Sequence, residues 1–266
     1  MQRNVIAVLF FLVSLLVASC SKVDALFNNG EVISEYRTVD QPFTVVSMFN
    51  NVNVMLVQDR HPHLELTCPK NLIGKVITEV KDDTLVIKNE NDFNWLRSFD
   101  YSIDLTVYYD SLRSVNYCSI SKLQSADSLL GMRMQLVDTT GNSIDSIKTR
   151  NFTLRILEGS GDIDLTFNCN VLKTVFTNGT SSITLRGYAG YTEHYMKSYG
   201  TVHAETMYSN IVKVMSESTN DIYVWSHSSL YAHLDNIGNA YYKGHPWIES
   251  RCTSDGRVIP LEQKTN

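Results

Sequence analysis

From about residue 144 to the end of the chain, apolar residues recur with a nearly constant spacing. Seven segments share one pattern, as in EGSGDIDLTF at residues 158–167. Each begins with a short turn of small or polar residues. Three positions follow, of which the first is apolar, the second is polar in most copies and the third is apolar in most copies. The first apolar positions, each an almost constant interval after the one before, are Ile144, Ile163, Ile183, Val202, Ile222, Ala240 and Val258. A period of about 20 residues over seven copies is typical of a repeat architecture.

The alternation within each copy predicts a half-buried β-strand, because successive side chains of a strand point to opposite faces. A second apolar group follows about ten residues later in most copies, so each copy is expected to supply two or three short strands. No helical period persists anywhere in the chain. We therefore predict an all-β solenoid whose coils of about 18–20 residues stack about 4.8 Å apart and bury one continuous apolar column.

The Gly-Ser-Gly-Asp turn at residues 159–162 also resembles a phosphate-binding loop. Such a loop needs glycines that follow a strand and open a helix. Here a strand follows the glycines, and later copies carry Asn-Gly-Thr-Ser or Ser-Thr-Asn-Asp instead. Small residues that tolerate unusual backbone angles are expected where a coil turns a corner. The motif is therefore interpreted as a corner between strands.

Residues 30–120 lack the period but are still strand-like. Residues 43–59 and 101–110 alternate and are rich in Val, Leu and Tyr, and Lys81-Asp82-Asp83 is a turn signal. This half either continues the stack, with Ile120 in the register of Ile144, or forms a separate capping sheet. Continuation is favoured, because no linker rich in Pro, Gly or Ser separates the halves. The predicted organisation is a signal peptide at 1–19, a tether at 20–29, an N-terminal β region at 30–120, solenoid repeats at 121–262 and a tail at 263–266.

Four segments carry a resemblance to a known family: NVNVMLVQD (51–59), ITEVKDDTLVIKN (77–89), GSGDIDL (159–165) with its echoes, and YYKGHPWIE (241–249). The chain resembles, over roughly residues 30–262, the head GIN domain auto-transporter adhesins, which are lipoproteins of Bacteroidetes-type bacteria. Members usually carry Gly-Ser-Gly-Asp in several coils, and here one copy is intact, so the chain resembles a divergent member. The resemblance implies a right-handed single-stranded β-helix and a role in adhesion.

The N-terminus has the layout of a secretory signal. Arg3 precedes an apolar run from Val5 to Ala18, which is shorter than the about 20 residues that a membrane span needs. Val17-Ala18-Ser19-Cys20 resembles the lipobox of bacterial lipoproteins, which implies cleavage before Cys20 and lipidation of that residue; an ordinary signal peptide is the alternative. We expect a lipid-anchored protein of the outer membrane, exposed at the cell surface.

Charge and cysteine content narrow the possible partners. The formal net charge of −5 becomes −6 when Arg3 is removed with the signal, so the basic patch that a nucleic-acid partner requires is not expected. Besides Cys20 there are four cysteines, Cys68, Cys118, Cys169 and Cys252, and their spacing neither forms a zinc motif nor selects a disulfide pairing.

No catalytic, metal or cofactor site is predicted. Asp145 and Asp164 share a register on neighbouring coils, about 4.8 Å apart, as in a retaining carboxylate pair. The next coil offers Thr184 there, with no Arg or Lys to complete a site, so surface aspartates are the favoured interpretation. His194 and His233 share a predicted register but have Lys213 between them, and His61 and His63 form an isolated loop pair.

The best binding candidate is an outward stripe of His203, Tyr223 and Tyr241, one residue on each of three successive coils. Flat amphipathic rings along a solenoid could dock sugar rings or an extended chain, with Trp225 and Trp247 expected nearby. The alternative is a side-chain ladder that stabilises the stack and binds nothing.

The sequence therefore predicts a surface lipoprotein without catalytic activity. It would be anchored in the membrane by its lipid and bind glycans or surface proteins through its long side. Two alternatives stay open: a periplasm-facing structural or regulatory lipoprotein, and a β-helix enzyme acting on carbohydrates.

Overall fold

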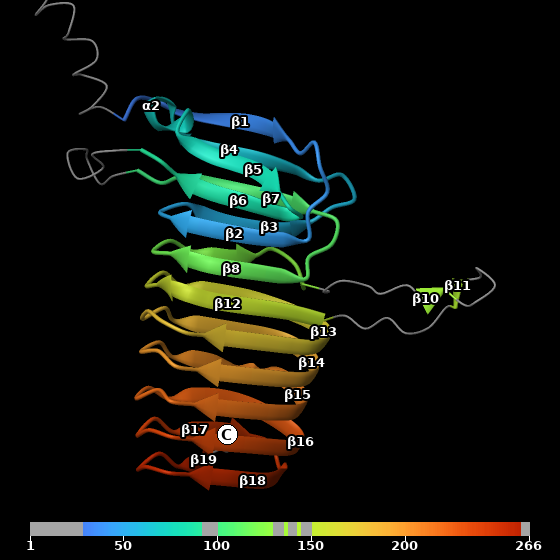
Figure 1. The fold of residues 1–266 in the computed structure, drawn as a ribbon, viewed down its shortest axis with the longest axis vertical. Coiled ribbons are helices and arrows are strands. Elements are labelled where there is room, and N and C mark those ends of the chain that lie inside the picture. Colours follow the sequence, from blue (N-terminus) through green and yellow to red (C-terminus); the bar gives the residue numbers. More distant parts are fainter. Residues whose placement is uncertain (1–28, 92–100, 130–135, 138–142, 145–150, 262–266) are drawn as a thin grey trace, which may run out of the picture.

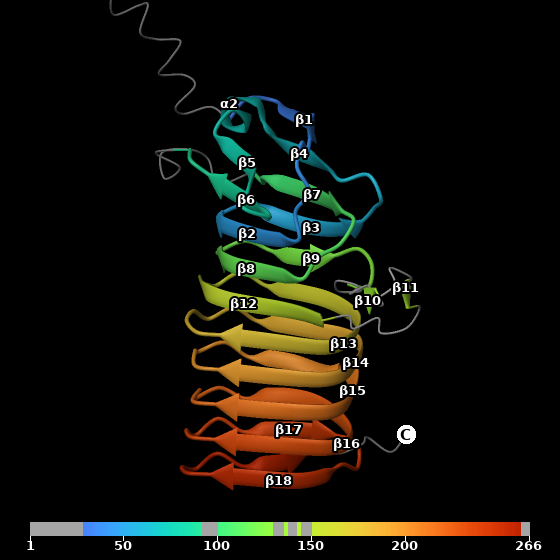
Figure 2. The same cartoon turned by 45° about the vertical axis from the view of Figure 1, so that its right-hand side comes forward.

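The protein is mostly β, with one large sheet that curls strongly around a single apolar core. The structure, a computed structural model, describes residues 29–91, 101–129, 136–137, 143–144 and 151–261. The main sheet has 17 strands in mixed orientation, and one short helix, α2 (Lys70–Ile73), accompanies it (Figures 1 and 2). Within the described residues, no helix combines the length and the apolar character that crossing a membrane requires.

The repeats form a stack of parallel strands. Four long strands are followed by three short ones: β13 (Ile163–Phe176), β14 (Ile183–Met196), β15 (Val202–Ser216), β16 (Ile222–Leu234), β17 (Ala240–Lys243), β18 (Trp247–Cys252) and β19 (Val258–Pro260). The predicted register is confirmed, because Ile163, Ile183, Val202, Ile222, Ala240 and Val258 pair in sequence along the stack. The first five of these residues are at most 1% exposed, so the period follows the buried column.

The prediction of two or three short strands per repeat is wrong for most repeats. β13 to β16 each run for 13–15 residues and bend without ending. A bend in β14 lies at Gly187, whose φ of +97° is a left-handed conformation that glycine adopts without strain. The repeat that begins at Ala240 does divide, at Gly244, into β17 and β18.

The prediction for the first repeats is also wrong. Leu123, not Ile144, pairs with Ile163, and Ile144 belongs to β11 (Ser143–Ile144), which pairs with β10 (Leu136–Val137) in a separate two-stranded sheet. Ile120 is 66% exposed and lies outside the core. The segment between Leu123 and Ile163 therefore holds one repeat and an insertion, which a count of the period mistakes for two repeats.

The parallel stack extends into the N-terminal half, although its order in space differs from its order in the chain. The strands are β2 (Val45–Asn50), β3 (Asn53–Gln58), β6 (Thr84–Asn89), β7 (Asp104–Tyr109), β8 (Ser114–Ser119), β9 (Leu123–Ser125) and β12 (Asn151–Gly159). β12 pairs with both β13 and β8, and β2 lies between β8 and β6. β3 likewise lies between β9 and β7.

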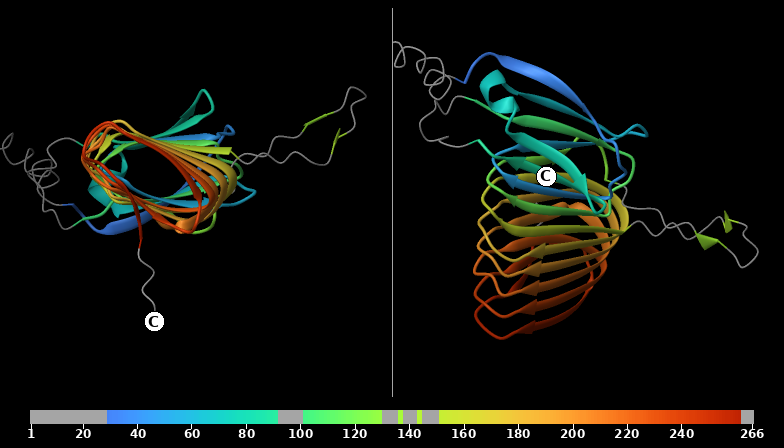
Figure 3. Two further views of the ribbon diagram at one scale, coloured as in Figure 1. Left: turned by 90° about the horizontal axis from the view of Figure 1, so that it is seen from below. Right: turned by 45° about the horizontal axis from the view of Figure 1, so that its top comes forward.

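Two walls enclose the core in an oval when the stack is viewed along its axis (Figure 3). We call first wall the strands β3, β7, β9, β17 and β19 with the first halves of β13–β16. We call second wall the strands β2, β6, β8, β12 and β18 with the second halves of β13–β16. Inward residues of both walls, such as Leu165, Leu185 and Phe176, are fully buried, and burying each such side chain contributes roughly 1.5–3 kcal/mol.

The two ends of the stack differ. At the N-terminal end β1 (Val32–Thr38), β4 (His63–Pro69) and β5 (Val76–Lys81) pair antiparallel with their neighbours and close the stack. Arg37 fixes this cap, because its guanidinium donates to the carbonyl oxygens of Val76 and Ile73 at 2.6 and 3.1 Å. At the C-terminal end, as far as the described residues show, β18 pairs only with β16, and β19 only with β17.

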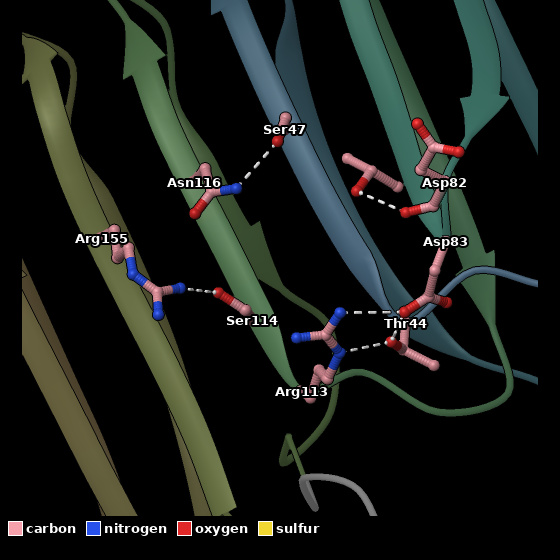
Figure 4. A network of polar contacts seen from close by, with 9 residues as sticks. Thr44, Ser47, Asp82, Asp83, Arg113, Ser114, Asn116 and Arg155 are labelled. Carbon is pink, nitrogen blue, oxygen red and sulfur yellow. Dashed lines mark hydrogen bonds and ion pairs between the residues drawn. The ribbon is translucent and has the colours of Figure 1, made fainter.

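A polar network holds β2 in its place between strands that are distant in sequence (Figure 4). Arg113 donates to Thr44 Oγ1 at 2.8 Å and to the Asp83 carboxylate at 3.0 Å. The predicted turn after Lys81 is confirmed, with φ of +47° at Asp82 and +62° at Asp83. Burial raises the pKa of Asp83, but hydrogen bonds from Thr44 and Arg113 outweigh it and hold the pKa below its usual value.

Candidate functional site

His203, Tyr223 and Tyr241 form a continuous ladder of stacked rings on the first wall. They pair in one register on β15, β16 and β17, as the period predicts. The ring centroids of His203 and Tyr223 lie 4.9 Å apart with an interplanar angle of 7°, and those of Tyr223 and Tyr241 lie 5.0 Å apart with an angle of 10°. The separation equals the strand spacing, so each layer adds one ring.

The ladder points outward because it alternates with buried residues. His203 stands between Val202 and Ala204, and Tyr223 between Ile222 and Val224, all four of which are at most 3% exposed. The three rings are half-buried, since each ring covers its neighbour and leaves its edge open. This arrangement presents a row of amphipathic ring edges along the stack axis.

Acidic groups surround the ladder. His203 Nδ1 lies 3.4 Å from the Glu205 carboxylate. Burial raises the pKa of Tyr223, and the charge of Asp221, the Tyr241 hydroxyl and the charge of Glu205 raise it further. The Tyr223 hydroxyl therefore remains protonated at neutral pH and can both donate and accept a hydrogen bond.

A second group of aromatic residues continues the ladder toward the bend between the walls. Trp225 lies two residues after Tyr223 on the same strand face, and Lys243 Nζ sits 3.9 Å from the centroid of its ring. Tyr208 meets Trp225 edge-on at 5.2 Å and stacks on Tyr188 at 5.9 Å. We call the whole surface the aromatic face; it consists of Tyr188, His203, Tyr208, Tyr223, Trp225, His227 and Tyr241.

The structure places the two predicted tryptophans differently. Trp225 belongs to the aromatic face, but Trp247 lies on the second wall, where it pairs with Ser229 and contacts Tyr231. The prediction for Trp247 is therefore wrong. Tyr188 and Tyr208 were missed, although they lie one period apart in the sequence and could have been found by that spacing.

The structure also corrects the surroundings predicted for Asp164. Thr184 lies in the register of Asp164, as expected. Arg186, two residues further along β14, forms an ion pair with the Asp164 carboxylate, so the expectation that no cation is near is wrong. Asp145 lies outside the described residues. The carboxylate of Asp164 is thus engaged by a cation on the next layer.

The predicted histidine register is wrong as well. His194 pairs with Val214, Lys213 with Glu193, and His233 with Met215. The cause is a register shift within the paired strands. Near the start of β14 the paired residues Ile183 and Val202 are one residue closer in sequence than the paired residues His194 and Val214 further along the same strand. Among the described residues, no three or more His, Cys, Asp or Glu side chains gather as a metal site would require.

The other singled-out histidines and cysteines have structural surroundings. His63 is stacked between Tyr36 and Tyr108, with centroid distances of 5.0 and 4.0 Å. Cys68, Cys118, Cys169 and Cys252 are all free thiols. Burial raises the pKa of Cys169 to about 12 and that of Cys68 to about 11, so both thiols are protonated and unreactive at neutral pH. Cys20 and residues 1–19 lie outside the described residues.

A family model matches most of the chain. The model described as "Putative auto-transporter adhesin, head GIN domain" matches residues 42–246. This range spans every layer from β2 to β17, including the ladder. No similar sequence was found among curated proteins.

Several solved structures have a similar fold. A "putative adhesin" of Bacteroides fragilis matches with a TM-score of 0.72 and 18% identity over 87% of this chain and 97% of its own. A "putative lipid binding protein" of Parabacteroides distasonis matches with a TM-score of 0.58 and 16% identity over 88% of this chain and 98% of its own. A "putative adhesin" of Parabacteroides merdae matches with a TM-score of 0.55 and 17% identity over 88% of this chain and 98% of its own. At these identities the likeness shows the fold alone.

Proposed function

The chain belongs to the auto-transporter adhesin family with a head GIN domain, and we propose from this that it is an exported adhesion protein that binds its target through the aromatic face. The observation that carries the proposal is the stacked ladder of His203, Tyr223 and Tyr241 on an otherwise regular wall. Amphipathic rings with an apolar body and a polar tip are enriched at binding surfaces. The proposed role is binding without catalysis.

We infer that the stacked layers are coils of a right-handed single-stranded β-helix. Three features support this: parallel pairing, nearly constant sequence offsets between most layers, and the closed oval of Figure 3. The handedness follows from the strong preference of connections between parallel strands for the right-handed form. Such a rod is rigid along its axis and presents one residue of each register per layer, which suits an extended ligand.

Glycans or extended surface proteins are the proposed targets. Along the stack axis, the rings of the ladder repeat every 4.9–5.0 Å. A chain that lies along the axis can therefore meet one ring edge and one tyrosine hydroxyl in each layer. Lys243 and Trp225, beside the ladder, add a cation and an indole to the same surface.

The double variant Tyr223→Ala/Tyr241→Ala tests the aromatic face. On an immobilised glycan array we expect binding to fall at least about tenfold, the equivalent of about 1.4 kcal/mol. The matched control is Tyr191→Ala/Tyr231→Ala, which removes two tyrosines from the second wall and should leave binding unchanged. Because stacked aromatic pairs contribute about 0.5–1.5 kcal/mol to stability, Tyr223→Phe/Tyr241→Phe serves as a variant that keeps the stack. Equal binding by the alanine variant and the unaltered protein would leave the ladder a stabilising device only.

We further propose that Cys20 carries the lipid that anchors the protein in the outer membrane. This rests on the signal-like layout of residues 1–20. In cells, Cys20→Ala should move the protein from the detergent phase to the aqueous phase, since acyl chains provide the anchor. Protease treatment of intact cells should degrade the unaltered protein while a periplasmic control survives. Protection until the outer membrane is broken would instead favour the periplasm-facing alternative.

A further inference from the structure

The C-terminal end of the stack is open. β18 is the last strand of the second wall and β19 the last strand of the first wall, and within the described residues each pairs with one strand (Figure 1). A parallel stack normally needs a terminal cap, because the last layer otherwise exposes backbone groups and the core. The N-terminal end has such a cap in β1, β4 and β5, whereas none of the described residues pairs with the outer edge of β18.

The core column also ends without cover at this layer. Leu230, Ala232 and Leu234 are at most 4% exposed on β16. Their register partners on β18 are Ile248, Ser250 and Cys252, of which Ile248 is half-buried and the other two are exposed. On the first wall Tyr242 and Val258 are also only partly buried. The open end thus has inward positions of mixed character that a further layer would cover.

We propose that two copies of this chain associate through their open ends, with the outer edge of β18 pairing antiparallel with β18 of the second copy about a twofold axis at Ser250. A twofold axis normal to the sheet keeps the inward-facing side chains of both copies on the same side of the joined sheet. The apolar cores of the two copies therefore become continuous. The contact is isologous, which is the usual form of a closed dimer.

The charge pattern of β18 selects this register. In an antiparallel pair, directly opposed residues point to the same face, so a twofold axis must pass through a residue. An axis at Ser250 places Glu249 opposite Arg251 of the second copy, twice, and Ile248 opposite Cys252. An axis at Glu249 or at Arg251 would instead set two like charges directly opposite each other, which is destabilising.

Other occupants fit this end less well. Head-to-tail stacking would bring β18 against β5, the strand at the N-terminal end of the same wall, and β5 runs antiparallel to β6, so the parallel stack would not continue there. The charges of Glu249 and Arg251 could also serve only to discourage pairing, as charges on edge strands often do. A role restricted to protection does not require their complementary order about Ser250, and the experiments below separate the two roles.

The proposed contact has a consequence for adhesion, which rests on the function proposed above. β1 and β18 lie at opposite ends of the stack (Figure 1). Association through β18 therefore sends the two N-terminal ends in opposite directions, as two chains anchored on facing cells would require. The β18 contact lies on the second wall and the aromatic face on the first wall and the bend, so one can fail without the other.

Charge reversal tests the register with purified protein and no glycan. By sedimentation from about 1 μM to about 1 mM, the range of weak specific contacts, we expect a reversible dimer. Glu249→Arg and Arg251→Glu should each weaken it at least about tenfold, and the double swap Glu249→Arg/Arg251→Glu should restore it. Glu79→Arg, on β5 at the capped end, is the control and should change nothing. A monomer throughout the range, or a swap that fails to restore the dimer while the melting curve is unchanged, would overturn the proposal.

A cross-link locates the axis independently. In a Cys252→Ser background, Ser250→Cys sets two thiols directly opposite each other, with Cβ atoms about 4.5–5.5 Å apart, close to disulfide geometry. Mild oxidation should therefore produce a covalent dimer in high yield. Ser254→Cys, in the turn after β18, lies far from the axis and should give little. Equal yields from the two variants would refute the register.

Discussion

Replacing Gly179 by alanine is expected to cost the fold about 2–4 kcal/mol. Gly179 has a φ of +104° in the turn that connects β13 to β14. A Cβ atom there would lie 2.2 Å from the carbonyl oxygen and 2.7 Å from the nitrogen of Gly159 on the preceding layer. Both obstacles are backbone atoms, so no side chain can move aside to relieve the clash.

The same turn is tied to its neighbours by hydrogen bonds. Thr180 N donates to the Gly159 carbonyl at 2.8 Å, and Tyr199 N donates to the Gly179 carbonyl at 3.1 Å. A backbone shift that accommodates a Cβ at Gly179 would therefore strain two further layers. We expect the loss to spread along the stack, because each layer is held only by the layers that contact it.

Thermal and denaturant unfolding measure this effect. For a chain of this size about 1 kcal/mol corresponds to about 2–4 °C, so Gly179→Ala should lower the melting temperature by about 5–15 °C. Gly74→Ala is the matched control: Gly74 has a φ of −69°, and nothing lies within 4 Å of its would-be Cβ. That change should be neutral or stabilise by up to about 1 kcal/mol. Equal melting temperatures for the two variants would mean that the turns yield more easily than the packing indicates.

The part of the fold that sequence could predict is the part fixed by burial. Ile163, Ile183, Val202 and Ile222 are each at most 1% exposed, so the core itself imposes their spacing. The same constraint fixes the outward positions between buried residues, which is why His203, Tyr223 and Tyr241 could be placed in one register before the structure was known.

The failures have physical causes that leave little trace in sequence. The insertion before β12 is about one period long, so counting could not separate it from a repeat. Register shifts within β14–β16 make the sequence separation of paired residues differ between the first and the second wall. A prediction that assumes one constant separation therefore assigns His194 the wrong partners. The position of β2 between β6 and β8 depends on contacts between residues far apart in the chain, such as Arg113 with Thr44.

His194 should make the protein lose stability in mild acid. Its side chain is buried in the second wall, in a register with Leu154, Thr174, Val214 and Ala232. The ring Nδ1 lies 2.8 Å from Thr174 Oγ1. Burial lowers the pKa of His194 from 6.5 to about 4, although the nearby Glu193 charge opposes the shift. The folded protein therefore holds a neutral imidazole at pH 7.

The sign of the pH effect follows from this depressed pKa. Between pH 6.5 and about 4 the unfolded chain binds a proton at His194 that the folded chain does not. Stability consequently falls as the pH drops through this window, by about 3 kcal/mol in total, and the full contribution is present only above pH 6.5. Glu193, whose pKa is lowered mainly by its hydrogen bond with Lys173, adds a loss only below its usual pKa of 4.5. Between about pH 6.5 and 5 the loss of stability therefore comes from His194 and not from Glu193.

The measurement compares unfolding free energies across this interval for the unaltered protein and for His194→Leu/Thr174→Val. The double change removes both polar partners, so neither is left unsatisfied in the core, and it should flatten the profile between about pH 6.5 and 5. His245→Leu, a change at an exposed histidine, is the matched control and should keep the slope of the unaltered protein. Denaturant titration suits the comparison, because the midpoint shifts in proportion to stability while the slope reports whether the same surface unfolds. If the unfolding free energy of the double variant still fell with pH as in the unaltered protein, another group would have to cause the pH dependence. The pKa of the buried imidazole would then lie nearer to that of a free histidine.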